Sequence, residues 1–166
     1  MFKIIVMKYI IMALLFLSAS ALTQAQDRED VNVKEILETK NFIFKAETVT
    51  PARGRLRQLT SEYDVIVKPD TVVSFLPYFG RAYSAPINPA DAGIKFTSVK
   101  FDYTVKTGKK NSWDVEISPS DAQDVQDLYL TVFDNGRATL RVNSVNRQTI
   151  SFNGYVVKGN AERKAF

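Results

Sequence analysis

Alternation of apolar and polar residues runs through most of the chain after Asn41. Along residues 42–48, apolar or small side chains take every second position, and Lys45 and Glu47 lie between them. The same alternation returns over residues 63–68, 113–117, 128–133, 138–145 and 148–157. A period of two is typical of strands with one buried and one solvated face. Because parallel sheets are covered on both faces and need continuously apolar strands, the pattern predicts an antiparallel β domain.

Short turn signals separate the predicted strands. Pro69-Asp70 precedes a strand over Val72–Leu76, and Asn135-Gly136 is a strong hairpin signal because both residues tolerate positive φ. About eight strands joined mostly by short turns predict an all-β, up-and-down antiparallel meander. Closure into a lipocalin-like barrel would remove exposed sheet edges, so we favour a barrel. A two-sheet sandwich is the alternative.

Three local irregularities interrupt this pattern. Over residues 94–105 the apolar phase shifts after Phe96, which predicts a β-bulge near Thr97-Ser98. Gly154 inside the last strand predicts a bulge or a close backbone approach. Ser118, followed by Pro119, is typical of a helix start, so a helical turn or two is expected within residues 119–127.

The N-terminal 25 residues have the pattern of a secretory signal peptide. Lys3 and Lys8 are the only charges before Asp27, and an apolar run over Tyr9–Leu17 is too short to span a bilayer. Small residues at Thr23 and Ala25 predict cleavage after Ala25. Cleavage after Ala21, translation from Met7 and an uncleaved membrane anchor are the alternatives. We therefore expect an exported protein, periplasmic or secreted, that has no stable membrane insertion after cleavage.

The remaining chain is predicted to divide into three parts. Residues 26–40 form an N-terminal segment with a short amphipathic helix, whose apolar side chains are Val33, Ile36 and Leu37. Residues 41–158 form the β-barrel domain, and residues 159–166 form a C-terminal tail. One domain of this size buries enough surface to fold without disulfides.

Composition narrows the chemistry that the chain can perform. There is no cysteine and no histidine, which excludes disulfides, a lipid anchor on a cysteine, and catalytic sets built on either residue. Asp121, Asp124 and Asp127 recur every three residues but lack the pattern of a calcium loop. Without the signal peptide, 20 basic residues face 18 acidic ones, too small an excess to indicate nucleic-acid binding. We therefore expect no enzyme, no metal site and no cofactor.

The richest segment for ligand binding is residues 77–93, which is dense in proline, glycine and aromatic residues. Connections of this length inside a compact domain are usually functional or disordered, and the apolar area of Tyr78, Phe79 and Tyr83 argues against disorder. We interpret it as a rim or lid with stacking aromatics and an arginine that grips an anion. The alternative is that its aromatics fold back over the core. Trp113 and Tyr103 are either core residues or the wall of a cavity. The ligand-binding candidates are Tyr78, Phe79, Arg81, Tyr83, Tyr103 and Trp113.

A second candidate is an alternating basic cluster before the strand that contains Tyr63. Arg53, Arg55 and Arg57 could bind phosphate or an anionic envelope polymer. The alternative is a solvated basic run that the nearby Glu62 and Asp64 offset.

Several strings of residues resemble a known family. They are Leu76-Pro77-Tyr78-Phe79-Gly80-Arg81-Ala82, Ala85-Pro86, Gly93-Ile94-Lys95-Phe96, Phe101-Asp102-Tyr103, the strand of Trp113, and Ile150-Ser151-Phe152-Asn153-Gly154-Tyr155. Together they resemble the family "domain of unknown function 4251", small exported proteins found mainly in Bacteroides-like bacteria. The resemblance spans about residues 34–158 and implies export, a single domain and a lipocalin-like topology. It implies no activity, ligand or catalytic residue.

These patterns lead us to expect a non-enzymatic binding protein of the cell envelope. It would hold an apolar or amphipathic small molecule at one barrel end, under the 77–93 loop. The alternative is a structural or interaction module that docks on another envelope protein or polymer through the same loop and the arginine cluster. A hydrolase acting on cell-wall glycan would need two carboxylates that converge in one cleft, which no spacing in the sequence indicates.

Overall fold

The computed structural model describes residues 32–83 and 93–159, so the predicted signal peptide and most of the 84–93 stretch lie outside the described residues. The described chain forms one short helix and nine strands. Their bounds are α2 (Val33–Glu38), β1 (Phe42–Pro51), β2 (Arg57–Val67), β3 (Val72–Leu76), β4 (Ile94–Ser98), β5 (Phe101–Thr107), β6 (Ser112–Pro119), β7 (Val125–Phe133), β8 (Arg137–Ser144) and β9 (Ile150–Lys158). Among these elements no helix has the length and apolar character to cross a bilayer.

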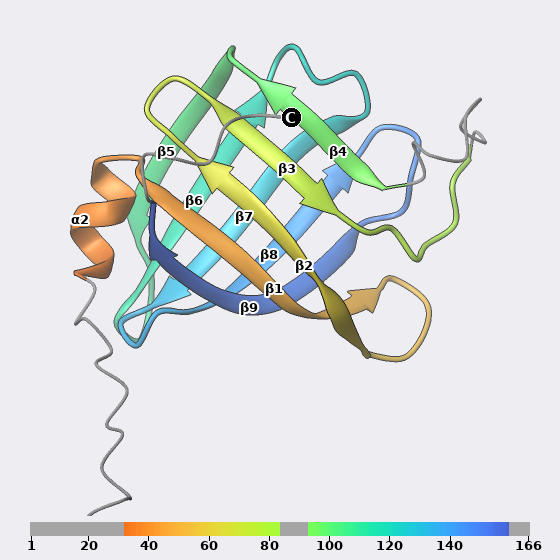
Figure 1. Ribbon diagram of the computed structural model, residues 1–166, viewed down its shortest axis with the longest axis horizontal. Coiled ribbons are helices and arrows are strands. Elements are labelled where there is room, and N and C mark those ends of the chain that lie inside the picture. The colour runs from red at the N-terminus through yellow and green to blue at the C-terminus, as the bar shows by residue number, and fades with distance from the viewer. Residues whose placement is uncertain (1–31, 84–92, 160–166) are drawn as a thin grey trace, which may run out of the picture. The chain divides into compact units, whose positions relative to one another are not determined.

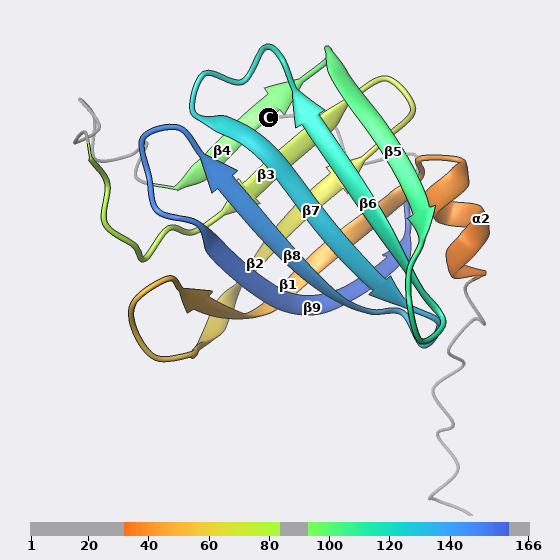
Figure 2. The same ribbon diagram turned by 180° about the vertical axis from the view of Figure 1, so that it is seen from behind.

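All strand pairs are antiparallel, and they form one curved sheet in the order β4-β3-β2-β1-β9-β8-β7-β6-β5. Except at β4 and β5, each strand lies beside its neighbours in sequence, and the first strand pairs with the last, so the sheet is an up-and-down barrel (Figure 1). Its two edge strands are β4 and β5. Because these two do not pair with each other, the barrel is nearly but not fully closed. Figure 2 shows β5 to β8 from the other side. The predicted all-β meander is therefore confirmed.

The number of strands differs from the prediction because residues 94–105 do not form one strand. The chain bends at Val99 and Lys100 and passes from one sheet edge to the other, so β4 and β5 are separate. The Val99 and Lys100 amides donate to the Asp121 carboxylate at 3.0 and 3.2 Å, and the Ser98 hydroxyl donates to it too. The shift of apolar phase marks this corner and not a bulge.

The helix expected within residues 119–127 is wrong. Pro119 ends β6, and β7 already begins at Val125. The Asp121 carboxylate, which would have lain in the first turn of such a helix, instead accepts hydrogen bonds from the β4–β5 corner. The contact of Asp121 with the distant β4–β5 corner is therefore formed in place of the helix start that the local sequence predicted.

Apolar side chains fill the inside of the barrel. Phe42, Phe44 and Phe152 are its largest fully buried side chains, and Leu128 and Leu140 on β7 and β8 are buried with them. Inward positions alternate along each strand, as the buried positions of β7 and β8 show. Such packing contributes most of the stability of a domain without disulfides.

Helix α2 is the predicted N-terminal helix, and its apolar face joins the same core. Val33, Ile36 and Leu37 are all buried. The helix starts at Asn32, whose side-chain oxygen accepts the Glu35 amide at 3.3 Å. Its last turn is held by Tyr103 of β5, whose hydroxyl donates to the Leu37 carbonyl at 2.7 Å.

The close approach predicted at Gly154 is confirmed. Gly154 pairs with Ala46, just where the register of β1 against β9 shifts. A Cβ atom at this position would meet the Lys45 carbonyl oxygen at 1.8 Å, so only glycine fits.

Candidate functional site

Three loops meet at the end of the barrel away from α2 (Figure 1). They are residues 52–57, which connect β1 to β2 and include the first residue of β2, residues 77–83 after β3, and residues 145–149 between β8 and β9. We call them together the rim surface. These three segments contain five arginines and no acidic residue.

Tyr78 fastens the middle loop to the β8–β9 loop. Its hydroxyl donates a hydrogen bond to the Arg81 carbonyl at 2.8 Å or the Gln148 carbonyl at 3.1 Å. Burial raises the pKa of the Tyr78 phenol, so the group stays a hydrogen-bond donor at neutral pH. The Tyr83 amide adds a bond to the Asn146 carbonyl at 2.8 Å. Tyr78 therefore connects the two loops of the rim, and its hydroxyl is already engaged and not available to a ligand.

Arg147 extends this fastening to two more segments. Its guanidinium lies over the Tyr78 ring at 5.2 Å, donates to the Gly93 carbonyl at 2.9 Å and pairs with the Asp124 carboxylate at 2.9 Å. Only a tenth of its side chain is exposed. The rim is thus built on an internally satisfied arginine that no pattern in the sequence singles out.

Phe79 and Arg57 connect the two stretches that the sequence picked out separately. The Arg57 guanidinium lies over the Phe79 ring at 5.2 Å from its centroid. Phe79 is 39% exposed, Leu56 beside Arg57 is 58% exposed, and Tyr83 is 73% exposed. The aromatic loop and the arginine cluster are therefore one surface, on which Arg53, Arg55 and Arg81 are also exposed.

Tyr103 and Trp113 do not belong to this surface. The Tyr103 hydroxyl is bonded to α2, and burial raises the pKa of its phenol. Trp113 lies near the start of β6, opposite Thr107 of β5, and packs against the core. The six predicted ligand-binding residues are thus divided between two regions of the barrel.

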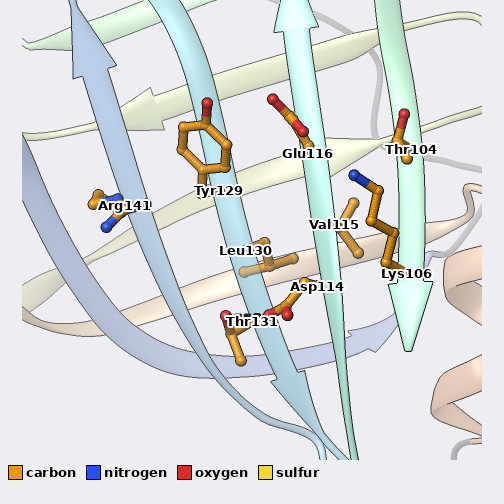
Figure 3. A pocket seen from close by; sticks show the side chains of 9 residues that line it. All are labelled: Thr104, Lys106, Asp114, Val115, Glu116, Tyr129, Leu130, Thr131 and Arg141. Carbon is orange, nitrogen blue, oxygen red and sulfur yellow. Dashed lines mark hydrogen bonds between the residues drawn. The ribbon is translucent and has the colours of Figure 1, made fainter. Parts of the chain in front are cut away.

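A groove that the sequence did not indicate lies on the outer face of β5 to β8 (Figure 3). Its volume is about 320 Å³. It is lined by Thr104, Lys106, Asp114, Val115, Glu116, Tyr129, Leu130, Thr131 and Arg141. The Arg141 guanidinium lies over the Tyr129 ring at 5.1 Å, and the Thr131 hydroxyl donates to Asp114 at 2.7 Å. This groove and the rim surface are two separate places where described side chains could meet a ligand.

A comparison of the chain with protein-family models identifies its family. The model described as "Domain of unknown function (DUF4251)" matches residues 24–156, most of the chain. The chain belongs to the DUF4251 family. The resemblance inferred from the sequence is therefore confirmed.

A solved structure supports the fold of this DUF4251 protein. A crystal structure of a DUF4251 family protein from Bacteroides eggerthii DSM 20697 matches with a TM-score of 0.56 and 17% sequence identity. The match covers 76% of this chain and 85% of that chain. A comparison with curated protein sequences finds no match.

Tyr129 gives the groove of this DUF4251 protein a polar aromatic centre. Partial burial raises the pKa of the Tyr129 phenol, and the neighbouring carboxylates of Asp127 and Glu116 raise it further. The phenol therefore stays neutral well above physiological pH. Tyr129 does not stand out in the sequence because it lies in an ordinary alternating strand, and only the cross-strand register places Glu116 and Arg141 on either side of it.

Proposed function

We propose that this protein is a non-enzymatic binding protein of the cell envelope that docks on an anionic polysaccharide through its rim surface. The observation that carries the proposal is the contact between Arg57 and Phe79, which joins a basic loop to an exposed aromatic loop. Cationic and stacking groups on one firm surface are what an acidic sugar chain needs from a binding protein.

The charge of the rim surface favours an acidic partner. The arginine guanidinium forms bidentate hydrogen bonds with carboxylate and phosphate groups, which the lysine ammonium cannot form. Arg53, Arg55 and Arg81 are exposed, and no carboxylate in the three rim segments competes for them. Exposed Leu56, Phe79 and Tyr83 add apolar area against which the face of a sugar ring can lie.

Packing inside the barrel favours this surface over an apolar ligand in the interior. Side chains such as Phe42, Phe44 and Phe152 are fully buried where a lipocalin-type ligand would sit. An apolar or amphipathic small molecule would have to displace them, whereas a polymer on the rim displaces only water. The interaction-module alternative is therefore the one that we adopt.

Retention on an immobilised acidic polymer tests the proposal. Mature protein is measured on polygalacturonate and on uncharged dextran, with the triple variant Arg53→Gln, Arg55→Gln and Arg57→Gln and with Phe79→Ala. We expect binding to polygalacturonate only, and a loss of affinity of about tenfold or more in each variant. Added salt should weaken binding because it screens exposed charges.

A matched control removes three charges elsewhere. Lys100, Lys109 and Lys110 are exposed and lie outside the rim. Their replacement by glutamine should change affinity by less than about twofold. Equal losses in both triple variants would mean that net charge and not the rim binds the polymer, and unchanged binding in the rim variants would overturn the proposal.

A further inference from the structure

Two polar rows cross the outside of the barrel side by side. Strand register places six residues of the first row directly opposite one another, and six more form the second. The first row is Lys106, Asp114, Thr131, Thr139, Asn153 and Thr48; the second is Thr104, Glu116, Tyr129, Arg141, Ser151 and Thr50. Six strands about 4.8 Å apart make this band roughly 24 Å long, measured along the sheet.

The first row is held in place by side-chain hydrogen bonds. Thr131 donates to Asp114 at 2.7 Å, and Thr139 donates to Asn153 at 3.0 Å. The Asn153 amide in turn reaches the Thr48 hydroxyl at 3.4 Å. Short side chains fixed in this way present hydroxyl and amide groups that both donate and accept, with little freedom left to lose on binding.

The groove lies where both rows reach β5 to β8, and Tyr129 is its aromatic centre (Figure 3). The Arg141 guanidinium covers one face of the ring at 5.1 Å, and the Glu116 carboxylate is its neighbour on β6. An aromatic ring among fixed polar groups can meet the C–H face of a sugar while the polar groups bind its hydroxyls.

The charges that line the groove balance. Lys106 and Arg141 are offset by Asp114 and Glu116. A charged ligand would meet a like charge at close range, whereas a neutral molecule rich in hydroxyls would find donors and acceptors of both signs. We propose that this outer groove binds a neutral saccharide chain, with Tyr129 against a sugar face and the two rows along its hydroxyls.

This proposal is independent of the rim surface. The groove uses other strands and other residues, and its lining has no net charge, while the three rim segments hold arginines and no acid. The protein would then have two binding surfaces for sugars of different charge.

Titration of 15N-labelled mature protein with neutral hexasaccharides tests the groove. The probes are cellohexaose, maltohexaose and chitohexaose, with an oligogalacturonate for comparison, each up to about 5 mM, which detects a Kd near 1 mM. At least one neutral probe should shift amides of Asp114, Glu116, Tyr129 and Arg141. Tyr129→Ala and Arg141→Ala should each weaken that binding about tenfold, and Tyr129→Phe about threefold or less.

Tyr83→Ala is the matched control, since Tyr83 is an exposed aromatic of the rim. It should leave the affinity for the neutral probe within about twofold. Shifts confined to the rim, or no shifts with any of the neutral probes, would overturn the groove proposal. Rim shifts with oligogalacturonate alone would support the rim and reject the groove, so the two proposals can fail separately.

Discussion

Asp121 controls the corner where the chain passes from one sheet edge to the other. Its carboxylate accepts hydrogen bonds from the Ser98 hydroxyl and from the Val99 and Lys100 amides. Those bonds, with that from Ser98 the strongest, hold the pKa of the Asp121 carboxyl below its usual value. One side chain thus satisfies backbone amides that the corner takes out of the β ladder.

Lower pH should loosen this corner. Because the folded-state pKa of Asp121 lies below its unfolded value of about 3.9, its contribution is complete at neutral pH and is lost as pH falls through the folded pKa. Asp121→Asn should therefore be less stable than the parent at pH 7, and the difference should shrink towards pH 3. Urea unfolding across this range measures it. Asp102→Asn, on the exposed face of β5, is the control, and a constant difference at all pH values would contradict the assignment.

At the scale of elements, α2 is attached to the barrel by its buried face and by one side chain of an edge strand. The helix has only six residues, too few to be stable alone, so its burial against the core and its bond to Tyr103 hold it. The Lys40 ammonium that follows it lies over the Tyr103 ring at 5.1 Å. Helix and edge strand β5 therefore stabilise one another beside the gap in the barrel.

Tyr103→Phe should free the helix without opening the barrel. It removes the donor to the Leu37 carbonyl and should lower the free energy of unfolding by about 1 kcal/mol. Hydrogen exchange by NMR should be faster at the α2 amides Ile36 and Thr39 and unchanged in β8 and β9. Tyr129→Phe, on the outer face, should alter neither. Uniformly faster exchange would show that Tyr103 supports the whole barrel.

Elements with a clear period were predictable from the sequence, and elements fixed by distant contacts were not. The alternation over residues 113–117 or 128–133 reflects a local fact, that one face is buried and the other is wet. The β4–β5 corner depends on Asp121, more than twenty residues away. A local pattern contains no record of such a partner, so the sequence indicated a bulge and a helix instead.

In the candidate site, too, single residues could be predicted from the sequence, but the contacts between them could not. Arg57 and Phe79 each stood out through composition, but their contact arises because β2 begins and β3 ends at the same rim. Tyr103 looked like a cavity wall because the sequence cannot show that α2 covers it. Glu116, Tyr129 and Arg141 lie on three strands, so only the register brings them together.

For the molecule as a whole, the filled interior decides which ligands it can hold. Phe152 of β9 is fully buried, and it belongs to the same core as Leu140 of β8 and Val49 of β1. Interiors packed in this way have no room for a guest unless a side chain is removed.

Removal of one large side chain should create that room. Phe152→Ala should cost about 3–5 kcal/mol and leave an apolar cavity. Benzene should then raise the Tm of the variant, because it binds only the folded state, and leave the Tm of the parent unchanged. Phe152→Leu, which keeps most of the volume, is the control. A rise in the Tm of the parent would instead show that the interior of the unmodified protein binds apolar molecules.

The pairing of the first strand with the last also determines which parts of the sheet can form while the chain is being synthesised. β9 is the neighbour of both β1 and β8, so before residues 150–158 emerge the chain can form only two separate half-sheets. Each half exposes an apolar face, and the contacts that join them link residues about a hundred positions apart, which makes folding slow. A nascent chain built this way can therefore close its barrel only after residues 150–158 have been made, so the complete fold is the last step of its synthesis.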